Sequence, residues 1–271
     1  MVPEISVQLY SVREQAAANY EGTIRAIADM GFINVEPAGF PGSTPELAAK
    51  LFKELGLKAP SCHGALPIGD DKNKIIETAQ LLGHKYIITG CPPDFQKNFE
   101  SIDSVKEVAE LYSEAAAFAA QYDIQVGYHN HDWDLKEVNG KRLYQVFLEN
   151  TPESVLWEAD LFWVTKAGLN PAEFVKEIGV RGKCLHFKDG FISNDDTFIE
   201  KETADGKIMV SGSKPFMPAG TGVVDLLGAA KVYDHTEIVA VELDSYVGDM
   251  MQAVQESYTY LTSNGIAKGN K

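Results

Sequence analysis

Residues 44–63 read TPELAAKLFKELGLKAPSCH and contain one complete helix-to-strand unit. Apolar residues recur through 44–55 at spacings of three and four, the period of an amphipathic helix, and Thr44 stands where a capping residue belongs. Gly56 supplies the left-handed conformation that ends a helix. The β-rich segment Lys58–His63 follows. A glycine followed by an apolar residue also stands at the end of a predicted helix at Gly31, Gly179 and Gly265.

Eight such units can be counted along the 271 residues. The strand candidates are Ile5–Tyr10, Ile33–Pro37, Lys58–His63, Tyr86–Thr89, Ile124–His129, Val155–Asp160, Cys184–Lys188 and Ile238–Leu243. Eight βα units in a chain of this length predict a closed (β/α)₈ TIM barrel, one α/β domain over residues 1–271. The competing architecture, a doubly wound open sheet, would show a glycine-rich phosphate loop after its first strand. Here Ser-Val-Arg-Glu follows Tyr10.

One stretch, residues 190–222, is long for a connection inside a compact domain. It lies between the seventh and eighth strand candidates. We expect a flexible cover or an excursion hairpin over the mouth of the barrel.

Composition narrows the class of partner. The net charge is −15, with 24 Lys and Arg in no basic stripe, which opposes nucleic-acid binding. No apolar run is long enough for a membrane span. The N-terminus lacks the features of a secretory signal, so a cytoplasmic protein with three reduced cysteines (Cys62, Cys91 and Cys184) is expected. Association into a homo-oligomer is expected by analogy with other barrels.

Side-chain alternation indicates where the chemistry lies. In the last four strand candidates one parity is apolar and suits the helix layer, while the other parity is polar. The polar members are His129 and His131, Glu158 and Asp160, His186 and Lys188, and Glu242 and Asp244. Interior polar residues near the carboxyl ends of strands mark barrel active sites. Buried ionisable groups must pair or bind a cation.

One residue from each of these strands gives a candidate metal set: His129, Asp160, His186 and Glu242. Two imidazoles with two carboxylates suit a borderline divalent cation. The carboxylates favour Mn²⁺, with Co²⁺, Fe²⁺ and Zn²⁺ as alternatives.

Several polar residues have both a functional and a structural interpretation. Glu158 and Glu242 are candidate catalytic bases, although Glu158 could equally form a core ion pair. Lys188 could stabilise a developing anion, or pair structurally with Asp189 or Asp244. Candidate substrate-binding residues are Gln8, Glu36, His63, His131 and Trp163. A structural histidine is the default interpretation for His63 and His84, an N-cap is the alternative for Asp160, and His235 is expected on the surface.

Several of these stretches resemble the xylose isomerase-like TIM-barrel superfamily, in particular its sugar phosphate isomerase/epimerase proteins. They are Tyr128-His129-Asn130-His131-Asp132, Asp160-Leu161-Phe162-Trp163, Leu185-His186-Phe187-Lys188-Asp189, Val241-Glu242-Leu243-Asp244 and the glycine segment 220–225. The resemblance places the metal ligands on the same four residues. Two departures stand out: many members have Glu at position 129, and many have His at position 163.

The resemblance implies a metal-dependent isomerase or epimerase that forms an enediolate from a small sugar or sugar phosphate. The alternative is a dehydratase or lyase acting on an inosose or a 3-keto sugar, and the missing Glu at position 129 favours it. A third possibility is a carbohydrate-binding protein without turnover.

Overall fold

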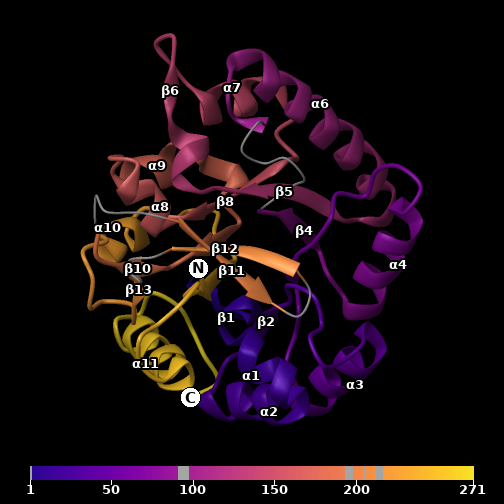
Figure 1. Ribbon diagram of the computed structural model, residues 1–271, viewed down its shortest axis with the longest axis vertical. Coiled ribbons are helices and arrows are strands. Elements are labelled where there is room, and N and C mark those ends of the chain that lie inside the picture. Colours follow the sequence, from indigo (N-terminus) through magenta and orange to yellow (C-terminus); the bar gives the residue numbers. More distant parts are fainter. Residues whose placement is uncertain (1, 91–97, 193–197, 204–205, 212–215) are drawn as a thin grey trace.

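Eight short parallel strands form the centre of the protein in a computed structural model (Figure 1). The structure describes residues 2–90, 98–192, 198–203, 206–211 and 216–271, and of 198–211 only the backbone. In spatial order the strands are β2 (Asn34–Glu36), β1 (Glu4–Gln8), β14 (Ile238–Val241), β9 (Cys184–His186), β8 (Leu156–Asp160), β5 (Gln125–His129), β4 (Tyr86–Thr89) and β3 (Ser61–His63). Chain order therefore runs around the ring, as the TIM-barrel prediction requires.

The ring closes between β2 and β3. Val35 donates its N–H to the Lys58 carbonyl at 2.9 Å, and Lys58 donates to the Ile33 carbonyl at 3.1 Å. His63 donates to the Pro37 carbonyl at 2.8 Å. Pro60 has no N–H to give, which interrupts the predicted strand 58–63 and leaves β3 short.

Helices surround the ring (Figure 1). They are α1 (Arg13–Ala18), α2 (Tyr20–Met30), α3 (Pro45–Leu55), α4 (Lys72–Leu82), α6 (Ile102–Ala119), α7 (Leu143–Asn150), α8 (Leu161–Lys166), α9 (Pro171–Ile178), α10 (Leu226–Ala230) and α11 (Met250–Ser263). Short 3₁₀ turns occur at η1 (Leu9–Val12), η2 (Ala120–Tyr122), η3 (Asp132–Leu135) and η4 (Gly179–Arg181). Among the described residues, no helix is both long and apolar enough to cross a membrane.

The quoted stretch folds as its pattern predicts. The Thr44 hydroxyl accepts the Leu47 N–H and caps α3, and Gly56 ends the helix with φ of 71°. The first strand is the clearest difference from the prediction. It ends at Gln8, because the Gln8 side chain accepts the Tyr10 N–H and starts the 3₁₀ turn η1 where Leu9 and Tyr10 were expected to continue the strand.

The barrel interior is layered. Towards the amino ends of the strands an apolar plug fills it, made of Tyr86, Ile88, Leu156, Cys184 and Ile238. The next inward-facing positions along the same strands are ionisable: Glu158 and Asp160 follow Leu156, and His186 follows Cys184. The polar side chains therefore lie on the carboxyl-end side of this apolar plug.

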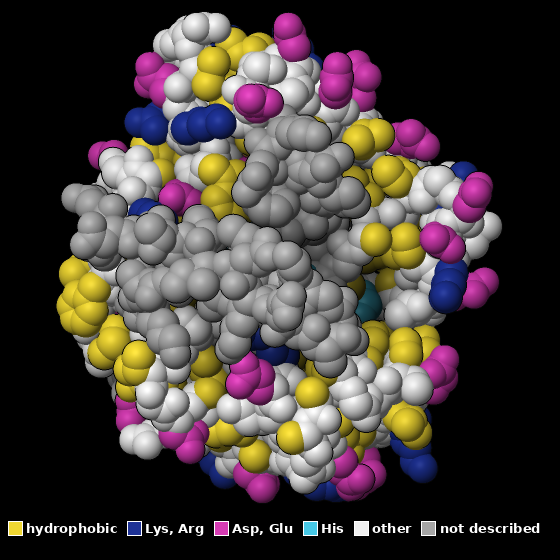
Figure 2. All heavy atoms as spheres, in the orientation of Figure 1, with side chains coloured by type: hydrophobic (Ala, Val, Ile, Leu, Met, Phe, Trp, Pro, Cys, Tyr) yellow, Lys and Arg dark blue, Asp and Glu magenta, His cyan; other side chains and the backbone are white. Residues whose placement is uncertain are grey.

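Strands occur in the described part of the segment after β9. β10 (Asp189–Gly190) pairs with β13 (Phe216–Met217), and β11 (Phe198–Thr203) pairs antiparallel with β12 (Gly206–Ser211). The structure thus has the hairpin among the two expected forms, and in the projection of Figure 1 it crosses the middle of the ring. In Figure 2 the Lys and Arg side chains that can be seen on this face are scattered among acidic ones.

Candidate metal centre

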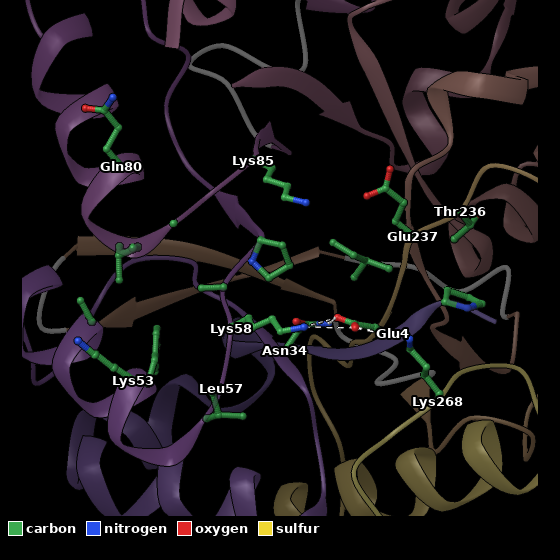
Figure 3. A pocket seen from close by; sticks show the side chains of 18 of the residues that line it. Glu4, Asn34, Lys53, Leu57, Lys58, Gln80, Lys85, Thr236, Glu237 and Lys268 are labelled. Carbon is green, nitrogen blue, oxygen red and sulfur yellow. Dashed lines mark hydrogen bonds and ion pairs between the residues drawn. The ribbon is translucent and has the colours of Figure 1, made fainter. Parts of the chain in front are cut away.

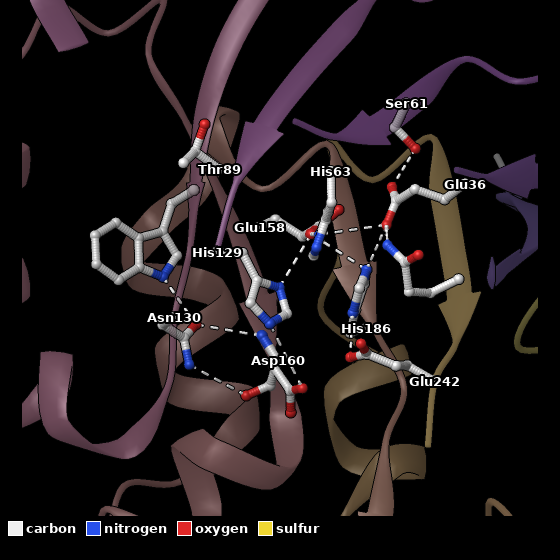
Figure 4. Close-up of polar contacts among 12 residues, drawn as sticks. Glu36, Ser61, His63, Thr89, His129, Asn130, Glu158, Asp160, His186 and Glu242 are labelled. Atoms are coloured by element: carbon white, nitrogen blue, oxygen red, sulfur yellow. Dashed lines mark hydrogen bonds and ion pairs between the residues drawn. The ribbon is translucent and has the colours of Figure 1, made fainter. Parts of the chain in front are cut away.

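The four predicted ligands come together at the carboxyl ends of β5, β8, β9 and β14 (Figure 4). We call His129, Asp160, His186 and Glu242 the outer tetrad. All four are buried, and one donor atom from each lies within 4.8 Å of the others. β8 and β9 set this up, because Asp160 and His186 are direct register partners. Whether the tetrad holds a metal stays a prediction.

Lys188 lies against the outer tetrad and is fully buried. Its Nζ is 2.9 Å from Asp160 Oδ2, 2.8 Å from Glu242 Oε2 and 3.0 Å from Asp244 Oδ2. Of the two structural partners considered for Lys188, Asp244 is the one it contacts. Burial opposes its charge, but these three carboxylates outweigh burial and raise the pKa of Lys188 well above its ordinary range.

Glu158 lies deeper, beneath the tetrad. Its Oε2 is 2.6 Å from His63 Nε2, 3.0 Å from His129 Nδ1 and 3.2 Å from His186 Nε2. Its Oε1 is buried without a hydrogen-bond partner among the described residues. His63 therefore belongs to the polar cluster, where a purely structural histidine was the default interpretation.

Gln8 and Glu36 form the floor on the side of β1 and β2. Gln8 Nε2 donates to Glu36 Oε1 at 2.6 Å, and the same oxygen lies 2.8 Å from His186 Nε2. The Ser61 hydroxyl donates to the other Glu36 oxygen. Both Gln8 and Glu36 are fully buried, and Glu36 is the one that contacts His186. Their predicted contact with substrate remains untested.

His131 and Trp163 lie on the β5–β8 side. The His131 ring stacks on Trp133 with centroids 4.2 Å apart, and its Nδ1 is buried without a hydrogen-bond partner among the described residues. The same holds for Trp163 Nε1. Burial holds the pKa of His131 well below its ordinary value, so the ring is neutral.

The pKa shifts of the residues in the outer tetrad are caused by burial and by neighbouring charges. Burial lowers the pKa of His129 to about 3, which leaves its imidazole neutral and able to offer a lone pair. Burial raises the pKa of Asp160 to about 6 despite the Lys188 ammonium. For Glu242, Lys188 and His186 outweigh burial and keep the pKa well below the ordinary value.

The excess of carboxylates around the donor atoms favours a bound divalent cation. Five carboxylates surround the cluster, from Glu36, Glu158, Asp160, Glu242 and Asp244. Lys188 is the one ammonium that the described contacts place among them. Four of the five carboxylates are buried, all but that of Asp244, and buried carboxylates in such excess need compensation from protonated imidazoles or from a bound cation.

Two residues near the site have contacts that were not predicted from the sequence. The Asn130 side-chain oxygen accepts the Trp157 indole N–H at 3.0 Å and the Asp160 backbone N–H at 3.2 Å, so it fixes the end of β8. Asp189 accepts four backbone N–H groups, from Gly190, Gly220, Gly222 and Val224. A polar residue on the outward parity of a buried strand was the available signal for Asn130.

The remaining histidines and thiols match their expected surroundings. His84 is buried with Nδ1 2.5 Å from the Ala59 carbonyl oxygen, and His235 is exposed. Cys62 and Cys184 are free thiols, whereas Cys91 lies outside the described residues.

Two cavities flank the barrel. One, of about 910 Å³, lies at the amino ends of the strands, where Figure 3 shows Lys58 and Lys268 beside Glu4. It includes no member of the outer tetrad. The other, of about 420 Å³, is lined by Cys62, His63 and Phe40 and reaches the cluster through His63.

The comparisons with known proteins give the fold. The sequence matches no protein-family model and no curated protein. A sugar phosphate isomerase/epimerase from Parabacteroides distasonis superposes with a TM-score of 0.75 at 22% identity, over 98% of this chain and 100% of that one. The chain has the fold of the sugar phosphate isomerases and epimerases. The resemblance seen in the sequence is thereby confirmed at the level of the fold.

Two further solved structures share this fold. The IOLI protein, described with a bound zinc atom, has a TM-score of 0.71 at 15% identity, over 97% of this chain and 98% of that one. A probable 3-DHS dehydratase from Bacillus anthracis has a TM-score of 0.70 at 14% identity, over 96% of this chain and 98% of that one. Both likenesses concern the fold alone.

Proposed function

We propose that this protein is a divalent-metal-dependent sugar isomerase or epimerase acting on a small sugar or sugar phosphate. The observation that carries the proposal is the outer tetrad, with four buried donor atoms within 4.8 Å. When bound there, a divalent cation would supply Lewis acidity that polarises a sugar carbonyl. Mn²⁺ is our choice because two of the four donors are carboxylates, with Co²⁺, Fe²⁺ and Zn²⁺ as the alternatives.

The residues of this chain supply the rest of the chemistry. Glu242 is the proposed base, because its carboxylate stays ionised beside Lys188 and belongs to the tetrad whose cation would polarise the substrate carbonyl. Lys188 would stabilise negative charge that develops on the sugar oxygens. Glu158, whose Oε1 has no hydrogen-bond partner among the described residues, is the second candidate base.

The apolar and imidazole side of the site would hold the sugar. His131 Nδ1 and the Trp163 indole N–H are buried polar atoms without hydrogen-bond partners among the described residues. A hydroxylated ligand would satisfy both groups, which otherwise cost free energy. Burial near these rings also excludes water from the reacting carbon.

The second candidate function is a dehydratase or lyase. His129 favours it, because a neutral imidazole replaces the carboxylate that would give a second proton-transfer group on β5. Both reactions begin with removal of a proton beside a carbonyl, and they part at the following step, which is either reprotonation or loss of an oxygen substituent.

The decisive experiment is incubation of metal-loaded protein with ketoses, inososes and 3-keto sugars in D₂O, followed by NMR. Deuterium at an epimerised or neighbouring carbon supports the isomerase, and a new enone supports the lyase. No exchange with any substrate, together with no bound metal, would refute both.

A matched pair of variants tests the ligands. Asp160 accepts the Phe162 and Trp163 N–H groups and caps α8, while Asp249 caps α11 far along the chain by accepting the Gln252 N–H. Asn preserves a cap at either position. Asp160→Asn should therefore lose Mn²⁺ binding and turnover, and Asp249→Asn should keep both.

A further inference from the structure

Three imidazoles converge on one oxygen of Glu158 (Figure 4). His63 Nε2, His129 Nδ1 and His186 Nε2 lie 2.6, 3.0 and 3.2 Å from Oε2. The other oxygen of the same carboxylate is buried and lacks a hydrogen-bond partner among the described residues. The two oxygens of Glu158 thus differ, since three imidazole nitrogens surround Oε2 and no described residue forms a hydrogen bond with Oε1.

Hydrogen bonds alone account for this arrangement only if the rings carry additional protons. Each imidazole would need its proton on the nitrogen that faces Glu158. His186 would need a second proton, since its Nδ1 lies 2.8 Å from Glu242 Oε2. With its proton on Nδ1, His129 would turn the lone pair of Nε2 towards Asp160 Oδ2, 3.9 Å away.

A shared cation accounts for the same convergence without those protons. In a tetrahedral site with bonds of about 2.0–2.1 Å, ligand atoms are about 3.3 Å apart and imidazole centroids about 5 Å apart. The three nitrogens approach Oε2 at 2.6–3.2 Å. The ring centroids of His63, His129 and His186 are separated by 4.8, 5.2 and 4.6 Å.

His63 is the adjustable member. Its ring plane lies within 5° of that of His186, so its ring would turn about the Cβ–Cγ bond to aim its nitrogen at a common ion. Its side chain is 17% exposed, whereas that of His186 is fully buried. His63 also lines the cavity of about 420 Å³, which gives a cation a way in.

Charge favours this deeper position as well. Two of the four outer donors, Asp160 and Glu242, already contact the Lys188 ammonium at 2.9 and 2.8 Å. None of the deeper donors contacts Lys188 in the described interactions. The Glu36 carboxylate, 3.4 Å from His63 and 2.8 Å from His186, brings a second negative charge to this point.

We propose that His63 Nε2, His129 Nδ1, Glu158 Oε2 and His186 Nε2 form a second divalent-cation site, the inner site. Its three imidazoles and one carboxylate suit Zn²⁺ or Co²⁺. The inner site shares His129 and His186 with the outer tetrad, but the outer carboxylates face the other nitrogen of each ring. His129 Nε2 is 3.9 Å from Asp160 Oδ2, and His186 Nδ1 is 2.8 Å from Glu242 Oε2. A neutral imidazole offers one lone pair, so the two sites exclude each other and the protein holds one ion at a time. The inner site does not depend on the reaction proposed above.

Co²⁺ binding tests the proposal. Metal-free protein is titrated with Co²⁺ while visible absorption, which is more intense for four-coordinate than for six-coordinate Co²⁺, is recorded. His63→Ala should weaken binding by at least about tenfold, since even partners outside the coordination shell contribute that much. It should also remove the four-coordinate bands. His235→Ala, at an exposed histidine, is the matched control and should bind as the wild type does.

X-ray absorption of the wild-type Co²⁺ complex supplies a readout that needs no variant. Three imidazoles in the coordination shell support the inner site, and two imidazoles overturn it. If His63→Ala binds Co²⁺ unchanged while Asp160→Asn loses it, the inner site is refuted and the outer tetrad, with the proposed function, survives. A wild-type protein that binds no divalent cation refutes both.

Discussion

Lys188 and Asp160 form a fully buried ion pair, with Nζ 2.9 Å from Oδ2. Glu242 and Asp244 share the same ammonium. Removing one partner of a buried pair leaves uncompensated charge and costs about 3–5 kcal/mol. Lys188→Met should therefore lower the free energy of unfolding of the metal-free protein by this amount, as measured by chemical denaturation.

Mn²⁺ should restore part of the stability that Lys188→Met loses, because a cation in the outer tetrad would replace the ammonium. An equal loss with and without Mn²⁺ would show that no cation can take that place. Lys141→Met is the control. Lys141 pairs with Glu149 at 3.4 Å on the surface, where such pairs contribute about 1 kcal/mol or less.

A second prediction concerns Gly127 in the middle of β5. A Cβ there would lie 2.6 Å from Ile88 Cδ1 and 2.9 Å from Leu156 Cβ. The Ile88 methyl can turn away, but Leu156 Cβ is fixed by its strand. Gly127→Ala should destabilise the protein by about 1–3 kcal/mol, the usual cost of overpacking.

Gly127→Ala should also weaken Co²⁺ binding, because pushing β5 from β8 moves His129 relative to Glu158, its register partner. Gly64→Ala is the control, since the nearest atom to its added Cβ is Cys62 Sγ at 3.9 Å. Loss of stability without any change in metal affinity would contradict the idea that strand spacing sets the site.

How far the sequence predicts this site depends on what fixes each group. Alternation along single strands predicted that Glu158, Asp160, His186 and Glu242 face inward, because parity is a local property of a strand. Contacts between strands depend on their relative stagger, which no local pattern contains. The convergence of His63 on Glu158 and the burial of Gln8 with Glu36 beneath His186 could therefore not be predicted.

Asp189 illustrates the same limit from another direction. The sequence suggested it as an ion-pair partner of Lys188, next to it in the chain. Adjacent residues of a strand point to opposite sides, however, and the structure directs Asp189 towards the segment 220–224. The donors to Asp189 are backbone N–H groups, and a sequence does not show which backbone groups a side chain contacts.

The third prediction follows from those bonds. Asp189 Oδ1 accepts from Gly190 and Val224, and Oδ2 accepts from Gly220 and Gly222, all within 3.1 Å. Asn retains only one accepting oxygen and turns an NH₂ group towards two N–H donors. Asp189→Asn should cost about 2–3 kcal/mol or more, since bonds to charged groups contribute about 1.5–3 kcal/mol each.

Thermal unfolding of Asp189→Asn, with Asp225→Asn as the control, checks this cost. Asp225 accepts one backbone N–H, from Gly228 at an exposed helix start, so its change should stay within about 1 kcal/mol. Equal effects of the two variants would show that the Asp189 bonds add nothing beyond an ordinary cap.

The last prediction is a pH dependence at Asp134, outside the metal cluster. Burial raises the pKa of Asp134 to about 8, although the His131 N–H and the Tyr128 side chain lower it. The folded protein thus keeps a proton that the unfolded chain releases near pH 4. Between about pH 4 and pH 8 the group therefore lowers the free energy of unfolding as pH rises, by up to about 1.4 kcal/mol per pH unit.

Asp134→Asn should remove this slope and retain an acceptor for the His131 N–H, which Asp134 Oδ2 accepts at 2.7 Å. Urea denaturation of the metal-free protein and variant is compared from pH 5 to pH 8. The variant should gain stability relative to wild type steadily as pH rises, because all other titrating groups are common to both. Asp249→Asn, at an exposed cap, is the control and should run parallel to wild type. Parallel profiles for Asp134→Asn would mean that the Asp134 carboxyl is already ionised in the folded protein at pH 5.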